Sequence, residues 1–166
     1  MMESLGLHHF DLGPHAAALI IAYVLALPIG WNREKAERTA GLRTFPLVAI
    51  ASCGFVQAAE GIAGDSSEAL ARIIEGSIVG MGFIGGGAIL RMKQSVKGTA
   101  TAASLWVTGA VGVAVGVGSV DVAVMLAMLT FLTLSVLSPL KPQERGEEDE
   151  PAPDRNGQPP RDPTLP

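Results

Sequence analysis

The sequence predicts an all-α, polytopic integral membrane protein with five transmembrane helices, the N-terminus outside and the C-terminus inside. Three observations predict this class: the length of the apolar stretches, the side on which lysine and arginine fall, and a change of composition near residue 140. The mean hydropathy of the whole chain, +0.37, understates how apolar the predicted membrane part is. The segment from Lys141 to Pro166 holds seven of the 11 prolines and seven of the 16 acidic residues, so the remainder is far more apolar than the average.

The change of composition divides the chain into two parts. Residues 1–140 are expected to form the transmembrane domain, and residues 141–166 a disordered, acidic, proline-rich cytoplasmic tail. Most of the net charge of -4 belongs to this tail, so the charge does not indicate an acidic-surface partner. The first apolar run lacks a basic segment before it and ends in a basic loop, so it is predicted to be a retained span rather than a signal peptide.

The spans follow from length, because roughly 20 apolar residues are needed to cross a hydrocarbon core about 30 Å thick. The stretches that qualify are 14–31, 44–60, 72–90, 99–118 and 120–139. The last two form one run from Thr99 to Leu140, which as a single helix would be about 63 Å long. The run must therefore fold back, and the glycine-bearing segment 116–121 is the predicted turn.

The orientation follows from lysine and arginine, because short loops rich in these residues stay on the cytoplasmic side. Two loops hold seven of the eight basic residues of the body of the chain, so these loops are predicted to be cytoplasmic. The opposite side has only one basic residue, Arg72, and its loop from Glu60 to Glu68 is acidic. Trp31 is predicted to be an aromatic anchor at the cytoplasmic interface. The basic residues of the two predicted cytoplasmic loops are Arg33, Lys35, Arg38, Arg43, Arg91, Lys93 and Lys97.

Glycines of the third span are candidates for close helix packing. Gly76 and Gly80 have small-xxx-small spacing, as do Gly82 and Gly86, and the two pairs point to different faces of a helix. Two interpretations remain open. Either the glycines pack against two neighbouring helices, or the run from Gly85 to Gly87 breaks the helix and lines a cavity.

A candidate ion path combines Glu75 with a polar stripe in the fourth span. Glu75 is the one carboxylate inside a span, which makes it a functional candidate and the only candidate metal ligand. Thr101, Ser104 and Thr108 share one side of a helix, where hydroxyls either bond to their own helix or line a path. Magnesium prefers several oxygen ligands, so one Glu75 is poorly equipped unless a homo-oligomer brings several copies together.

Catalytic machinery is not expected. The sequence shows no nucleophile with a base and an orienting partner and no phosphate-binding loop, and the three histidines are confined to residues 8–15. Cys53 is the sole cysteine and lies in the second span, so a disulfide framework or a cysteine metal cluster is not expected. The chain is therefore predicted not to be an enzyme.

Two blocks of the sequence carry distinctive motifs. The first contains AGLRT at residues 40–44, and the second runs from GMGFIGGG at residues 80–87 to TAASLW at residues 101–106. With these motifs, the chain closely resembles the MgtC/SapB family of bacterial inner-membrane proteins. The resemblance covers roughly residues 16–138. The residues that carry the family motifs are Arg33, Gly41, Arg43, Gly82, Gly85, Gly87, Arg91, Gly98, Thr101 and Trp106.

The resemblance implies a five-span domain of the bacterial inner membrane, with the lipid bilayer as its first partner, and a link to magnesium limitation. One implied function is magnesium transport or homeostasis by a homo-oligomer, with Mg²⁺ as a transported or sensed ion and no resident cofactor. The alternative is a non-transporting regulator that binds another membrane complex, such as ATP synthase, through glycine-rich helix faces and basic loops. Neither function involves nucleic acid.

The sequence also departs from the family pattern. Asn32 stands where the family commonly has a glutamate, Ala100 where it often has Asn or Thr, and Glu75 where it usually has a small residue. Family members often carry a cytoplasmic ACT-like domain after the spans. This domain is expected to be absent here, because residues 141–166 are too few and too rich in proline and acidic residues to form a core.

Overall fold

The computed structural model describes residues 12–36, 40–63, 66–91 and 96–137, so the predicted tail lies outside the described residues. Between α3 and α4, a two-stranded antiparallel ladder pairs Leu90 with Lys97 and Arg91 with Val96. The all-α class is confirmed, and this ladder is a local addition that the sequence did not predict. The elements are α1 (Leu12–Ala36), α2 (Thr44–Ala63), α3 (Ser67–Gly87), β1 (Leu90–Arg91), β2 (Val96–Lys97), α4 (Thr99–Gly116) and α5 (Val120–Leu137).

Length and composition make this a membrane protein. Four helices, α1, α3, α4 and α5, are long and apolar enough to cross a bilayer, and α2 is apolar over Thr44–Glu60. Large apolar side chains lie exposed on the outer surface, among them Phe83 at 85% and Leu129 at 63% exposure. In water, exposing so many large apolar side chains would be unfavourable. In a membrane-spanning bundle, lipid covers them.

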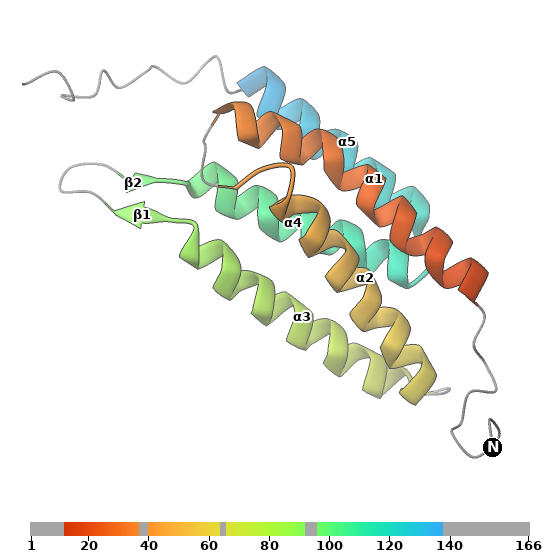
Figure 1. Ribbon diagram of the computed structural model, residues 1–166. Helices are drawn as coiled ribbons and strands as arrows, with labels where there is room; N and C mark the ends of the chain where they lie inside the picture. Colours follow the sequence, from red (N-terminus) through yellow and green to blue (C-terminus); the bar gives the residue numbers. More distant parts are fainter. Residues whose placement is uncertain (1–11, 37–39, 64–65, 92–95, 138–166) are drawn as a thin grey trace, which may run out of the picture.

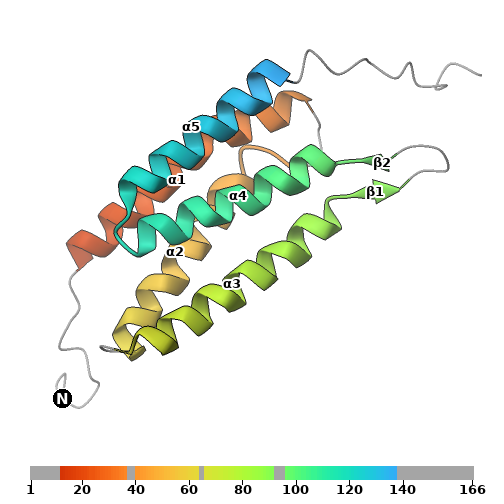
Figure 2. The same cartoon turned by 180° about the vertical axis from the view of Figure 1, so that it is seen from behind.

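The helices form a bundle with α4 at its centre. α4 packs against all four other helices, and its most extensive contact is with α2 (Figure 1). α1 and α5 lie on one side of α4, while α3 lies at the opposite edge and makes its main contacts with α2 and α4 (Figure 2). α3 therefore has one face that the described part of the chain leaves uncovered.

The two basic segments lie at the same end of the bundle. The C-terminal end of α1, the ladder between α3 and α4, and the C-terminal end of α5 are all at the left in Figure 1. The connection from α2 to α3 and the turn from α4 to α5 lie at the other end. This arrangement agrees with the alternation of loops that the orientation was based on; the side of the membrane that each end faces stays a prediction.

Two boundaries of α3 differ from the predicted span of 72–90. The helix begins five residues earlier, at Ser67, because the hydroxyl oxygen of Ser66 accepts a 3.3 Å hydrogen bond from the backbone N–H of Ala69 and caps the first turn. It ends at Gly87, before the ladder. Hydropathy marks the apolar part of a helix, whereas a cap extends the helix into polar sequence.

Glycines with positive φ begin α4 and end it. The residue that caps the start of α4 is Gly98, at φ 88° and with no side-chain cap bond. The predicted turn at 116–121 is confirmed: Gly118 has φ 80°, and the N–H of Ser119 donates to the carbonyl of Ala114 at 2.8 Å. Both positions use the left-handed region that glycine enters without steric cost.

The closest helix packing within the chain is made by glycines of α4. A Cβ added at Gly112 would collide with the carbonyl oxygen of Ala49 in α2 and lie 2.9 Å from the Cβ of Ser52. A Cβ added at Gly116 would lie 2.7 Å from that of Val56. These glycines bring the backbones of α2 and α4 together, as small residues do between helices in lipid.

Candidate functional site

The polar stripe of α4 is buried in the bundle. Thr101 and Thr108 are fully buried and Ser104 nearly so. The hydroxyl of Ser104 donates to the carbonyls of Ala100 at 2.8 Å and Thr101 at 3.0 Å. The hydroxyl of Thr108 donates to the carbonyl of Ser104 at 2.7 Å. The hydroxyls of Ser104 and Thr108 thus bond to their own helix, which is the first of the two predicted alternatives.

Replacing Thr108 by valine tests this structural role. The substitution keeps the shape of the side chain and removes one hydrogen bond, so the free energy of unfolding should fall by about 1 kcal/mol. Unfolding of the purified protein in mixed micelles measures the change, with Val111→Thr as the matched control that buries a new hydroxyl next to the stripe. A stability unchanged or raised by Thr108→Val would contradict a bonded, packed hydroxyl.

Glu75 does not lie with the α4 stripe. Its side chain is exposed on α3, on the side away from α2 and α4. Arg72 does not serve as its ion partner, because Arg72 pairs with Glu68 one turn earlier, at 2.9 Å. The proposed ion path of Glu75, Thr101, Ser104 and Thr108 is therefore not assembled within one chain: the stripe faces the core, and Glu75 faces outward.

The glycines of α3 also differ from the expectation of packing. A Cβ added at Gly76, Gly80, Gly82 or Gly86 would meet nothing within 4 Å, so these four make no close helix contact within the described part of the chain. Gly85 is the exception, because a Cβ there would lie 3.3 Å from the carbonyl oxygen of Ala102 in α4. The alternative of a broken helix is wrong, since α3 is continuous as far as Gly87.

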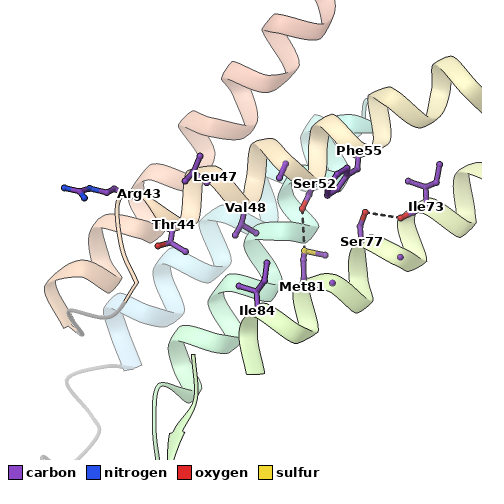
Figure 3. Close-up of a pocket in the computed structure, with 13 residues that line it drawn as sticks. Arg43, Thr44, Leu47, Val48, Ser52, Phe55, Ile73, Ser77, Met81 and Ile84 are labelled. Atoms are coloured by element: carbon purple, nitrogen blue, oxygen red, sulfur yellow. Dashed lines mark hydrogen bonds between the residues drawn. The ribbon is translucent and has the colours of Figure 1, made fainter. Parts of the chain in front are cut away.

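A groove of about 670 Å³ lies between α2 and α3. Figure 3 shows Leu47, Val48 and Phe55 on the α2 side and Met81 and Ile84 on the α3 side. Gly76 and Gly80 belong to the α3 wall, where the missing side chains widen the groove. One of the two small-xxx-small pairs thus opens into this groove, and the other, Gly82 with Gly86, lies on the outer face of α3.

The groove contains few polar groups, and two of them, the hydroxyls of Ser52 and Ser77, are hydrogen-bonded within the chain. The hydroxyl of Ser52 donates to the sulfur of Met81 at 3.6 Å, across the groove floor. The hydroxyl of Ser77 donates to the carbonyl of Ile73 at 3.0 Å. Arg43 lies at the α2 start, and its side chain extends away from the groove in Figure 3. The groove suits an apolar occupant, because Arg43 at its end is the one charged residue in the lining and no carboxylate is there to bind a cation.

The AGLRT block builds the entry into α2. The backbone N–H groups of Thr44 and Phe45 donate to the carbonyl of Gly41 at 3.0 and 3.2 Å, and the Glu34 carboxylate accepts from the N–H of Leu42 at 2.6 Å. A Cβ added at Gly41 would collide with the Glu34 carboxylate. Gly41 is therefore a packing residue of this loop, while Arg43 is exposed and free of that role.

Arg33 is the largest fully buried side chain described. One of its terminal nitrogens donates to the side-chain oxygen of Asn32 at 3.0 Å. The amide nitrogen of Asn32 donates to the Ser135 hydroxyl at 3.2 Å, which links α1 to α5. Asn32, where the family commonly has a glutamate, is thus part of the contact network at this end of the bundle. The sequence did not reveal this role.

The remaining motif residues have mixed roles. Gly98 and Gly85 are sites of close backbone approach, since a Cβ at Gly98 would collide with the carbonyl oxygen of Ala88. Trp106 is exposed at 45% and Trp31 at 55%, and the Trp31 ring lies 4.9 Å from the ammonium of Lys35. The side chain of Arg91 lies outside the described residues. Sequence reasoning missed the groove altogether, because its walls come from helices whose relative placement no pattern encodes.

A metal site within one chain is not formed by the described residues. Over the ranges that the structure describes, no group of three or more histidine, cysteine, aspartate or glutamate residues could hold a metal ion. Glu75 is therefore still the only candidate carboxylate inside a span, and a site built on it would need ligands from a second molecule.

Comparison with known proteins gives a consistent result. The MgtC family model matches residues 19–143. Protein SrpB of Synechococcus elongatus is 41% identical over a match covering 60% of this chain and 62% of SrpB. Protein MgtC of Brucella abortus is 41% identical, over 64% of this chain and 44% of that protein. Protein MgtC of Salmonella typhimurium is 37% identical, over 63% and 44%. The chain thus spans less than two thirds of these relatives, and no solved structure matches it.

Proposed function

Because the chain belongs to the MgtC family, we propose that it is an inner-membrane protein of magnesium homeostasis that acts by binding a transmembrane helix of another membrane protein. The observation that carries the proposal is the groove between α2 and α3, with Gly76 and Gly80 on its wall and nothing within 4 Å of a Cβ added at either. The magnesium link rests on the family resemblance.

The groove supports a helix as its occupant. Its walls are two helices of the bundle, its lining is apolar, and one wall has the small-xxx-small spacing through which helices approach closely in lipid. The hydroxyls of Ser52 and Ser77 are bonded within the chain, so an apolar helix face would leave no polar group unpaired at these positions. A partner helix with small and apolar residues is the occupant that this chemistry recognises.

Filling the groove should remove function without unfolding the protein. In a strain that depends on this chain for growth at low magnesium, Gly80→Leu should reduce rescue at least tenfold, because the new side chain occupies the space of the partner. Its thermal unfolding should match that of the wild type, since the position is open. Leu129→Phe, which adds bulk on the exposed face of α5, is the control and should rescue fully.

A photoreactive phenylalanine analogue locates the partner. Placed at Phe55 in the groove, it should give a heterologous adduct in native membranes that Gly80→Leu abolishes; placed at the exposed Phe131 of α5, it should not. Full rescue by Gly80→Leu, or equal adducts at both positions, would count against a groove-bound partner.

Magnesium transport is the second candidate, and the intramembrane carboxylate Glu75 favours it. Measuring magnesium flux into proteoliposomes that contain only this protein distinguishes a transporter from a regulator. The regulator proposal expects magnesium flux equal to that of empty liposomes. A flux that Glu75→Gln removes would instead support transport and overturn the regulator.

A further inference from the structure

We propose that the groove between α2 and α3 binds an anionic phospholipid, with one acyl chain along the apolar lining and the phosphate at Arg43. The chemistry of the groove changes along its length. Arg43 is the one charged residue of the lining, and the walls beyond it consist mostly of apolar side chains and glycines. A ligand that is complementary to both parts is apolar over most of its length and negatively charged at one end.

Arg43 lies at the boundary of the hydrocarbon core. It comes directly before Thr44–Glu60, the apolar part of α2, so its guanidinium group is at the level of the lipid phosphates. The side chain is exposed and extends beyond the start of α2, away from the apolar lining (Figure 3). Within the described ranges, Arg43 has no ion-pair partner. Its guanidinium group can therefore bind a phosphate through two parallel N–H···O bonds.

The length of the groove matches one leaflet of the bilayer. Phe55 lies 11 residues after Thr44, or about 17 Å along the α2 axis, and both residues line the groove. Half of a hydrocarbon core about 30 Å thick is about 15 Å. An acyl chain that starts at a phosphate beside Arg43 therefore follows the groove to the middle of the membrane. The volume of about 670 Å³ lies within the range of sites that hold one small ligand.

The groove is open to the bilayer, so a lipid can enter from the side. Leu47 on the α2 wall is 60% exposed, and Ile84 on the α3 wall is 47% exposed. Between the walls, Gly76 and Gly80 make room for the chain, because a Cβ added at either would meet nothing within 4 Å. An acyl chain is apolar and flexible, and it brings no hydrogen-bonding group into this part of the groove.

The lipid site does not rest on the proposed function, because the protein and the lipid alone are enough to form it. The two proposals place two occupants in the same groove at different times. The lipid fills the groove until a partner helix displaces the acyl chain. The phosphate contact at Arg43 is required for the lipid, whereas the partner helix is recognised through the apolar walls and the glycines of α3.

Lipid retention by the purified protein tests the contact with the phosphate. The protein in detergent micelles is mixed with phosphatidylglycerol or with phosphatidylcholine of identical acyl chains, and bound lipid is measured by native mass spectrometry. The wild type should retain one phosphatidylglycerol per chain, about tenfold more tightly than phosphatidylcholine, because only phosphatidylglycerol has a net negative charge. Arg43→Gln should remove this preference.

The matched control is Lys35→Gln, which deletes another exposed cation at the same end of the bundle. The ammonium of Lys35 lies over the ring of Trp31 and does not line the groove, so this variant should keep the preference for phosphatidylglycerol. Equal retention of the two lipids by the wild type, or equal losses in Arg43→Gln and Lys35→Gln, would show non-specific surface lipid and overturn the site.

Two glycine variants of α3 test the position of the acyl chain. Gly80→Leu fills the groove and should lower retention of phosphatidylglycerol about tenfold. Gly82→Leu adds the same side chain at an open position outside the groove and should stay within about twofold of the wild type. Unchanged retention in Gly80→Leu would contradict an acyl chain in the groove. Arg43→Gln should lose the lipid but still give the partner adduct at Phe55, so failure of either proposal is recognised separately.

Discussion

Gly112→Ala should lower the free energy of unfolding by about 3 kcal/mol or more, one of the two largest effects expected in this chain. The added Cβ would collide with the carbonyl oxygen of Ala49 and lie 3.0 Å from its carbonyl carbon. Both are backbone atoms of α2, so no side chain can move aside; the helices must separate. Because α2 and α4 share the most extensive contact of the bundle, their separation weakens packing along both helices.

The matched control is Gly76→Ala. That glycine is also inside a span, but its added Cβ would meet nothing within 4 Å. The substitution should leave stability unchanged or raise it by up to about 1 kcal/mol, since alanine favours helix over glycine. Unfolding titrations in mixed micelles measure both variants. Equal stability of the two would show that α2 and α4 do not meet at Gly112.

Gly98→Ala should lower stability by about 3 kcal/mol, for two separable reasons. The backbone of Gly98 has φ 88°, where an alanine costs roughly 1–2 kcal/mol. The added Cβ would also collide with the carbonyl oxygen of Ala88, which lies at the end of α3. The substitution should therefore disturb the junction of α3 and α4, where the ladder forms.

Gly118 separates the two reasons experimentally. It has a similar φ of 80°, but a Cβ there would meet nothing within 4 Å. Gly118→Ala should cost only the backbone term, and Gly118→Asn less, because asparagine tolerates this region. Gly98→Asn should still be strongly destabilising. If asparagine restored stability at both positions, the collision with Ala88 would not be present.

Hydropathy and charge predicted the spans because both are properties of the local sequence. The turn at Gly118 and the placement of both basic segments at one end of the bundle follow from apolar length and loop composition. The end of α1 was predicted too early, at residue 31, because the helix continues through Arg33 and Lys35 to Ala36. The start of α3 was predicted too late because Ser66 caps the helix in polar sequence. A cap is a single hydrogen bond, and hydropathy does not register it.

The candidate site could be predicted only in part, because it depends on which helices become neighbours. The stripe of Thr101, Ser104 and Thr108 was recognised as a face, and its burial follows from the central place of α4. The glycines of α3 were recognised by spacing, yet spacing is the same whether a glycine meets a helix or open space. The contacts are instead made by Gly112 and Gly116 of α4, in a run where small and apolar residues alternate without a charge.

The short apolar part of α2 has a consequence for the surrounding bilayer. Thr44–Glu60 is 17 residues, or about 25 Å as a helix, against a hydrocarbon core of about 30 Å. Such hydrophobic mismatch is relieved by local thinning of the bilayer, at a modest cost for each ångström. The bilayer beside α2 should therefore be thinner than around α1 or α5. Neighbours with short spans would relieve the same deformation, so they are drawn to the side of the molecule on which the groove opens.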